Sequence, residues 1–155
     1  MKKTIISVAL AVFLLNGYSQ EKKETKTAKS VNVPELVKKA FAAEFPSVAK
    51  VKWSIEKPGE YEAEFDLNKT GTSALFDSKG VVLEKESKMK ESDLPQTIKS
   101  ALAKGFVGYK ISEIEKTDSK GKVTYEMEAK KGKKESELVF DASGKLMKQA
   151  AEKKD

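Results

Sequence analysis

Four glutamates have a spacing that could support acid–base chemistry. They are Glu62 with Glu64, and Glu126 with Glu128. Residues two apart on a β-strand point to one face, so each pair would place two carboxylates side by side, as glycoside hydrolysis requires. Both pairs, however, form the outward half of an alternating apolar and polar pattern, and we expect Lys50 and Lys52 on a strand beside the first pair. A solvated ladder of opposite charges is therefore the favoured interpretation.

Two short motifs match those of penicillin-interacting serine enzymes. Residues 47–50 have the Ser-x-x-Lys spacing, and residues 69–71 read Lys-Thr-Gly. Those enzymes need a much larger fold and a Ser-Asp-Asn element, which this sequence lacks. Ser47 follows a proline that should end a helix, and Lys69 falls in a predicted hairpin turn, so neither motif has its usual structural context. We therefore predict that the protein is not an enzyme.

The composition excludes several kinds of site. The chain has 30 basic residues, all of them lysine, against 24 acidic residues, and it has no histidine and no cysteine. Histidine is the commonest general base and metal ligand near neutral pH. Arginine is the side chain that grips phosphate or a guanine edge. Asp77 and Asp141 each offer a predicted turn one carboxylate, whereas a calcium loop needs several oxygens. We predict no metal, no cofactor and no nucleic-acid partner.

Residues 1–19 are typical of an export signal. Lys2 and Lys3 are followed by an apolar run at residues 5–15, and small residues precede a cleavage position between Ser19 and Gln20. A membrane anchor is the alternative, but the run is short for a bilayer span. A lipoprotein is excluded because no cysteine could carry the lipid. We expect a periplasmic or secreted protein with no stable membrane insertion after cleavage.

The remaining sequence follows the same plan twice, at residues 33–88 and 94–149. Pro95 follows Pro34 by 61 positions, and Phe106 follows Phe45 by the same interval. Tyr125 then follows Tyr61 by 64 positions, so three residues have been inserted between these landmarks. A repeat of this length indicates a duplicated supersecondary unit.

Each unit is predicted to be one helix followed by a four-stranded antiparallel meander. A helical stripe of apolar residues follows each proline, and the period then changes to two. In the first unit the stripe comprises Leu36, Val37, Ala40, Phe41 and Phe45, and the first strand alternates Val51, Trp53 and Ile55 with polar residues. Asp77 to Gly80 and Asp141 to Gly144 suit type I turns that end in a left-handed glycine.

The predicted fold class is α+β, with the two units joined into one larger sheet and both helices on one face. Joining edge to edge would bury an unpaired edge of each meander, and we expect the units to share a single interior. Around the two units we predict a signal peptide at 1–19, a disordered polar tether at 20–32, a linker at 89–93 and a charged tail at 150–155.

The landmarks resemble the PepSY-like, beta-lactamase-inhibitor-like family of exported proteins, often from Bacteroidetes-type bacteria. The resemblance is carried by Pro34, the strand residues Val51-Lys52-Trp53 and Tyr61-Glu62-Ala63-Glu64-Phe65, the turn from Phe76-Asp77 to Gly80, and Leu83-Glu84. It covers both units. The resemblance implies a non-enzymatic exported domain, similar to a beta-lactamase inhibitory protein in its tandem helix-plus-sheet plan.

We predict an exported, non-enzymatic binding module of the cell envelope, whose partner is a protein, a peptide or an envelope polymer. Candidate partner-binding residues are Lys50, Lys52, Trp53, Glu62, Glu64, Glu126 and Glu128. Trp53 is expected in the core, but at the rim of the sheet it would be the best anchor for a partner. The alternative, implied by the resemblance, is an inhibitor or modulator of a secreted hydrolase such as a beta-lactamase or a protease. Outward Lys, Glu, Ser and Asp side chains, rather than aromatic ones, weaken this alternative.

Overall fold

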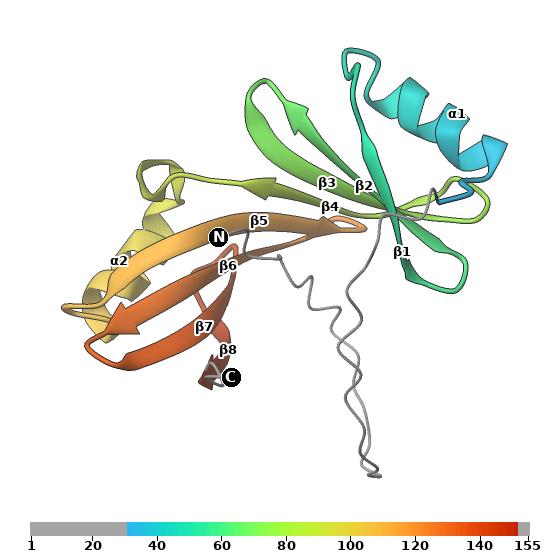
Figure 1. The fold of residues 1–155 in the computed structure, drawn as a ribbon. Coiled ribbons are helices and arrows are strands. Elements are labelled where there is room, and N and C mark those ends of the chain that lie inside the picture. Colours follow the sequence, from blue (N-terminus) through green and yellow to red (C-terminus); the bar gives the residue numbers. More distant parts are fainter. Residues whose placement is uncertain (1–30, 152–155) are drawn as a thin grey trace, which may run out of the picture. The chain divides into compact units, whose positions relative to one another are not determined.

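The computed structural model describes residues 31–151, which form two helices, a short 3-10 helix and eight strands (Figure 1). The predicted signal peptide, most of the predicted tether and residues 152–155 lie outside the described residues. In chain order the elements are α1 Glu35–Glu44, β1 Lys52–Lys57, β2 Glu60–Leu67, β3 Thr70–Asp77, β4 Val82–Lys88, η1 Glu91–Asp93, α2 Gln96–Gly105, β5 Lys110–Ser119, β6 Lys122–Lys131, β7 Lys134–Asp141 and β8 Leu146–Ala151.

The eight strands form one antiparallel sheet in the order β1 to β8, with β4 and β5 joining the two units. Directly paired residues point to the same face of a sheet. A chain of such pairs leads from Phe65 through Thr72, Ser87 and Lys116 to Tyr125. Phe65 belongs to the core that contains the buried residues of α1, and Tyr125 to the core of α2. Both helices therefore cover one face, and the predicted α+β architecture is confirmed.

Each helix begins immediately after a proline and buries one narrow stripe. Pro34 and Pro95 lie at the N-caps, where the absent N–H leaves no helical hydrogen bond unmade. α1 buries Val37 and Phe41, and α2 buries Ile98 and Leu102, so each helix turns two side chains one helical turn apart toward the sheet.

The turns after β3 and β7 hold each helix close to its own meander. Asp77 Oδ1 accepts hydrogen bonds from the backbone N–H groups of Lys79 and Val81, both at 2.9 Å. Gly80 has a φ of +83°, and a Cβ there would lie 2.8 Å from the carbonyl oxygen of Leu36. Gly144 has the same role in the second unit. The left-handed glycine at the end of each predicted turn is therefore confirmed.

The core consists of two separate clusters, so the prediction of a single shared interior is wrong. One cluster surrounds Phe76 between α1 and its meander, and the other surrounds Phe140 between α2 and its meander. The reason lies where the units meet, because every residue pair between β4 and β5 is polar. These pairs are Lys85 with Asp118, Glu86 with Thr117, Ser87 with Lys116, and Lys88 with Glu115.

The link between the units is partly ordered into the single turn η1. The Met89 N–H donates to the Ile114 carbonyl at 2.8 Å, and Leu94 is buried in the second cluster. Within residues 31–151, neither helix is long and apolar enough to cross a membrane.

Candidate binding face of the sheet

The sheet has a face that no described helix covers, which we call the open face. Its side chains follow from the strand register. One line of paired residues runs from Glu62 on β2 through Leu75 on β3 to Glu84 on β4. A second line begins at Lys88 on β4 and runs through the later strands. It comprises Lys88, Glu115, Glu126, Val139 and Lys148.

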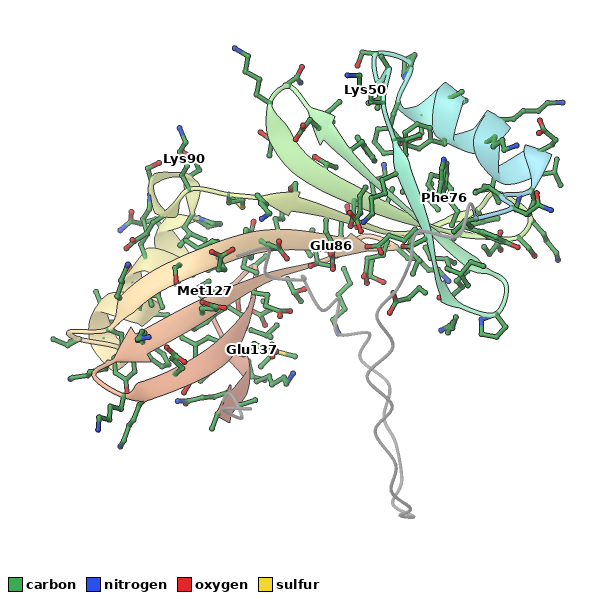
Figure 2. The ribbon with its side chains drawn as sticks, in the orientation of Figure 1. Lys50, Phe76, Glu86, Lys90, Met127 and Glu137 are labelled. Carbon is green, nitrogen blue, oxygen red and sulfur yellow. The ribbon has the colours of Figure 1, made fainter. Side chains whose placement is uncertain are left out.

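Glutamates gather along the open face across the junction of the two units. We call this set the carboxylate row. It comprises Glu62, Glu84, Glu86, Glu115, Glu126 and Glu137, from strands β2 to β7. Figure 2 labels Glu86 near the junction and Glu137 farther along the second unit. All six side chains belong to half-buried residues, so the row is part of the packed sheet surface rather than a fringe of mobile side chains.

Several acids in this region lie directly opposite another acid on one of their neighbouring strands. Glu115 lies directly opposite Glu126, and Glu128 directly opposite Glu137. Like charges in directly opposed positions destabilise a sheet. Near β1 the pattern is the usual one. There, Lys52 Nζ lies 2.8 Å from Glu64 Oε2, and the Ser54 hydroxyl donates to Glu62 Oε2 at 3.1 Å. The expected ladder of opposite charges is thus present at the outer edge of the first unit. Toward the centre the pattern is mixed, because Glu115 also lies opposite Lys88 and Glu137 Oε1 lies 2.7 Å from Lys148 Nζ.

The crowding raises the pKa of several carboxyl groups. Burial, together with the neighbouring Glu86 carboxylate, raises the pKa of Glu84 to about 7. Burial, followed by the charges of Glu137 and Glu86, raises the pKa of Glu126 to about 7, against the opposing effect of Lys148. Burial also raises the pKa of Glu62 and of Glu115 above the ordinary range. The centre of the open face therefore holds carboxyl groups that lose their protons near neutral pH.

Comparison with known proteins identifies the fold and the family. The family model described as "Putative beta-lactamase-inhibitor-like, PepSY-like" matches residues 18–84 and again residues 59–148. The chain belongs to this PepSY-like family. The first match covers most of the first unit, and the second begins within the first unit and covers nearly all of the second, so together they confirm the resemblance inferred from the sequence. No curated protein matches the chain significantly.

Two solved structures share the architecture of this PepSY-like chain. A structure described as a putative periplasmic protein from Bacteroides eggerthii has a TM-score of 0.71 and 18% identity, with 77% of this chain and 88% of that chain covered. A BLIP-like protein from Bacteroides fragilis has a TM-score of 0.70 and 16% identity, with 81% of this chain and 90% of that chain covered. At these identities the likeness concerns the fold alone.

The structure divides the sequence-predicted site residues of this PepSY-like protein into two groups. Lys52, Glu62, Glu64, Glu126 and Glu128 lie on the open face, as the register of β1, β2 and β6 requires. Trp53 instead pairs with buried Ala63, and its ring lies 5.3 Å from that of Phe41, so it faces the helix side. Lys50 precedes β1 and belongs to no strand. Trp53 therefore cannot anchor a partner that binds the open face.

Sequence reasoning missed Glu84, Glu86, Glu115 and Glu137. The alternation of Glu84, Lys85, Glu86 and Ser87 is a usable signal, because residues two apart share a face of a strand. It does not reveal that β4 pairs with β5, which is what brings these glutamates together. Leu75 and Val139 were also missed. They are half-buried aliphatic residues, each set between a glutamate and a second charged residue on the open face.

The arrangement includes neither a metal cluster nor the usual context of the two serine-enzyme motifs within residues 31–151. Among residues 31–151, no group of three acidic side chains is arranged to hold a metal ion. The Ser-x-x-Lys residues lie in the connection between α1 and β1, whereas Lys69 has a φ of +67° in the turn between β2 and β3. A sheet face that presents charged and aliphatic groups suits the capture of another surface.

Proposed function

We propose that this PepSY-like protein is an exported, non-enzymatic binding module of the cell envelope, and that its open face holds a protein partner with a lysine- or arginine-rich surface. The observation that carries the proposal is the carboxylate row. In a chain with a net charge of +6, glutamates gather at the centre of one uncovered sheet face and oppose each other there.

Charge complementarity determines the partner class. A cationic surface would neutralise the row and relieve the repulsion between Glu115 and Glu126. Complementary charges also speed association and select against acidic partners. Leu75 and Val139 provide small apolar patches among the glutamates. The predicted signal peptide supports export, and the similar Bacteroides eggerthii protein is described as a putative periplasmic protein.

The experiment is affinity capture from an envelope extract with matched variants. The mature protein is compared with a triple variant, Glu84→Gln, Glu115→Gln and Glu126→Gln. The control variant loses the same number of negative charges away from the open face, through Glu35→Gln on α1 and Glu91→Gln with Asp93→Asn in η1.

The proposal expects a basic protein that the wild-type and control proteins retain and the triple variant loses. Its binding to purified protein should weaken as salt rises, because exposed charges are screened. The proposal fails if the triple variant retains the same proteins as the control, or if the shared partner is acidic.

A second candidate function is inhibition or modulation of a secreted hydrolase. It is favoured by the family's description and by the structural likeness to a BLIP-like protein. Against it, Trp53 packs on the helix side, whereas protein interfaces usually depend on aromatic or arginine anchors. Titration against panels of beta-lactamases and proteases tests it directly. Unchanged rates at micromolar protein would remove this candidate and leave the first one intact.

A further inference from the structure

We propose that the pairing between β4 and β5 is a joint at which the two units separate reversibly without unfolding, and that ionisation of the carboxylate row favours the separated state. We call this pairing the seam. It comprises Lys85 to Lys88 of β4 and Glu115 to Asp118 of β5. The inference does not depend on the proposed partner.

The seam differs from the other strand pairings in composition. It has four directly paired positions, one fewer than β1–β2, β3–β4 and β7–β8, whereas β2–β3 and β6–β7 each have eight. No seam pair is apolar on either face. In contrast, β2–β3 pairs Ala63 with Ala74, and β6–β7 pairs Met127 with Leu138. Opening the seam therefore breaks backbone hydrogen bonds that water can replace, and each such bond contributes little net stability.

Separation at the seam leaves both cores intact. β4 contains no buried residue, and the only buried residue of β5 is Ile114, which belongs to the core of the second unit. Each cluster lies between a helix and its own meander, so no buried side chain has to leave its cluster when β4 and β5 part. Local opening is easiest where few apolar contacts oppose it.

Charges on the open face oppose closure when they are ionised. Across the seam, Glu86 of β4 acts on Glu115 of β5 and on Glu126 of β6, whereas the acidic neighbours of Glu84 are Glu86 on its own strand and Glu60 on β2. Glu60 and Glu62 on β2 and Glu113 on β5 add negative charge nearby, whereas Lys88 on β4 and Lys148 on β8 offset part of it. The uncharged neighbours are Ser73 and Leu75 on β3, Thr117 and Ser119 on β5, and Val139 on β7.

The helix side of the seam carries a nearly balanced set. Lys85 lies opposite Asp118 and forms an ion pair with Glu44 of α1, and Lys116 lies opposite Ser87. The net repulsion therefore comes from the open face, where acids outnumber lysines.

The sign of the pH effect follows from the direction of the pKa shifts. Burial, followed by Glu137 and by Glu86 across the seam, raises the pKa of Glu126 to about 7, and burial with Glu86 across the seam raises the pKa of Glu115. The closed seam therefore binds protons more tightly than the open one. As pH rises through 7, the closed state loses this advantage and the open state gains population.

Amide hydrogen exchange on the mature protein tests the joint directly. Exchange at the seam amides is compared with exchange at Ala74 to Phe76 and at Leu138 to Phe140, at pH 6 and pH 8, after correction for intrinsic rates. We expect seam protection about tenfold or more below that of the core strands, and a further fall at pH 8 that the core strands do not share. Equal protection at the seam and in the cores, or a parallel loss in both, would overturn the proposal.

Two variants separate the joint from its pH response. Glu115→Gln with Glu126→Gln should keep the seam weak but remove most of its pH dependence, because these are the groups whose pKa is raised by Glu86 across the seam. Glu86→Cys with Thr117→Cys places a pair of cysteines at directly opposed positions in a chain that otherwise has none. The oxidised form should raise seam protection to the level of the core, and reduction should restore opening. If the oxidised and reduced forms exchange alike at the seam, the joint does not exist.

Discussion

The separation of the two cores predicts that damage to one unit leaves the other folded. Phe76 is fully buried in the first cluster, and truncating a buried phenylalanine to alanine costs about 3–5 kcal/mol. A unit of this length has a total stability of roughly 3–8 kcal/mol at typical values per residue. The substitution Phe76→Ala should therefore unfold most of the first unit.

The second unit should survive this change, because its cluster does not include any residue of the first unit. Its only shared structure is the seam, so it loses one strand partner and no buried contact. Hydrogen exchange of Phe76→Ala should show lost protection on β2 and β3 and retained protection on β6 and β7. Phe140→Ala, at the equivalent position of the second cluster, should give the reverse result, with lost protection on β6 and β7 and retained protection on β2 and β3.

The assay distinguishes two cores from one. Urea unfolding of Phe76→Ala, followed by hydrogen exchange at residue resolution, should show two transitions. The first unit should unfold at a lower urea concentration than the second, because the substitution lowers only the midpoint of the first unit. If β6 and β7 lose protection by the same free energy as β2 and β3, the units unfold together and the reasoning from separate clusters is refuted. Substitutions in separate clusters should also be additive within about 0.5 kcal/mol.

Three further predictions concern turns, charge and a surface ion pair. Gly144→Ala and Gly59→Ala should each lower the free energy of unfolding by roughly 1–2 kcal/mol, because both positions have a positive φ. Gly144→Ala should cost clearly more in urea unfolding, because a Cβ there would also lie 2.7 Å from a helix carbonyl oxygen, whereas a Cβ at Gly59 meets nothing. Glu84→Gln with Glu126→Gln should stabilise the protein at pH 8 by about 1 kcal/mol per site, after allowance for solvent screening, and by little at pH 4; an equal gain at both pH values would contradict this. Lys52→Ala should change the free energy of unfolding by only about 0.2–1 kcal/mol, because its ion pair is exposed.

The elements of the fold were predictable because their signals are local. The interval between Pro34 and Pro95 identified the repeat, and the apolar stripe after each proline placed both helices. Asp77 and Gly80 identified the turn between β3 and β4 from residue types alone, since a left-handed position favours glycine. Each of these signals lies within a few residues of the feature that it specifies.

The seam and the carboxylate row were not predictable, because both depend on long-range register. Glu62 and Glu126 could be assigned to the open face from strand alternation within β2 and β6. The meeting of Glu86 with Glu115 and Glu126 depends on which residues of β4 align with β5, and a shift of one residue would turn side chains of one strand to the other face. The same register sets polar against polar residues across the units, so it also explains why the interior divides into two.

Binding and opening should be linked, because the carboxylate row extends across the seam. A cationic ligand that contacts Glu86 on one side and Glu126 on the other favours the closed state, since it neutralises charges that closure brings together. By thermodynamic linkage, the ligand then stabilises the closed state, and this stabilisation grows with the ratio of free ligand concentration to Kd. The effect should be larger at pH 8 than at pH 6, because more of the row is ionised at pH 8.

A lysine-rich peptide is the probe, and an acidic peptide of equal length is the control. Binding is measured by fluorescence anisotropy of the labelled peptide, and seam exchange is measured in the same buffer. Saturating basic peptide should raise protection at the seam amides at pH 8 and have a smaller effect at pH 6, while core amides change less. If the basic peptide binds but leaves seam exchange unchanged at pH 8, it occupies another surface, and the assignment of the open face as the binding face is wrong.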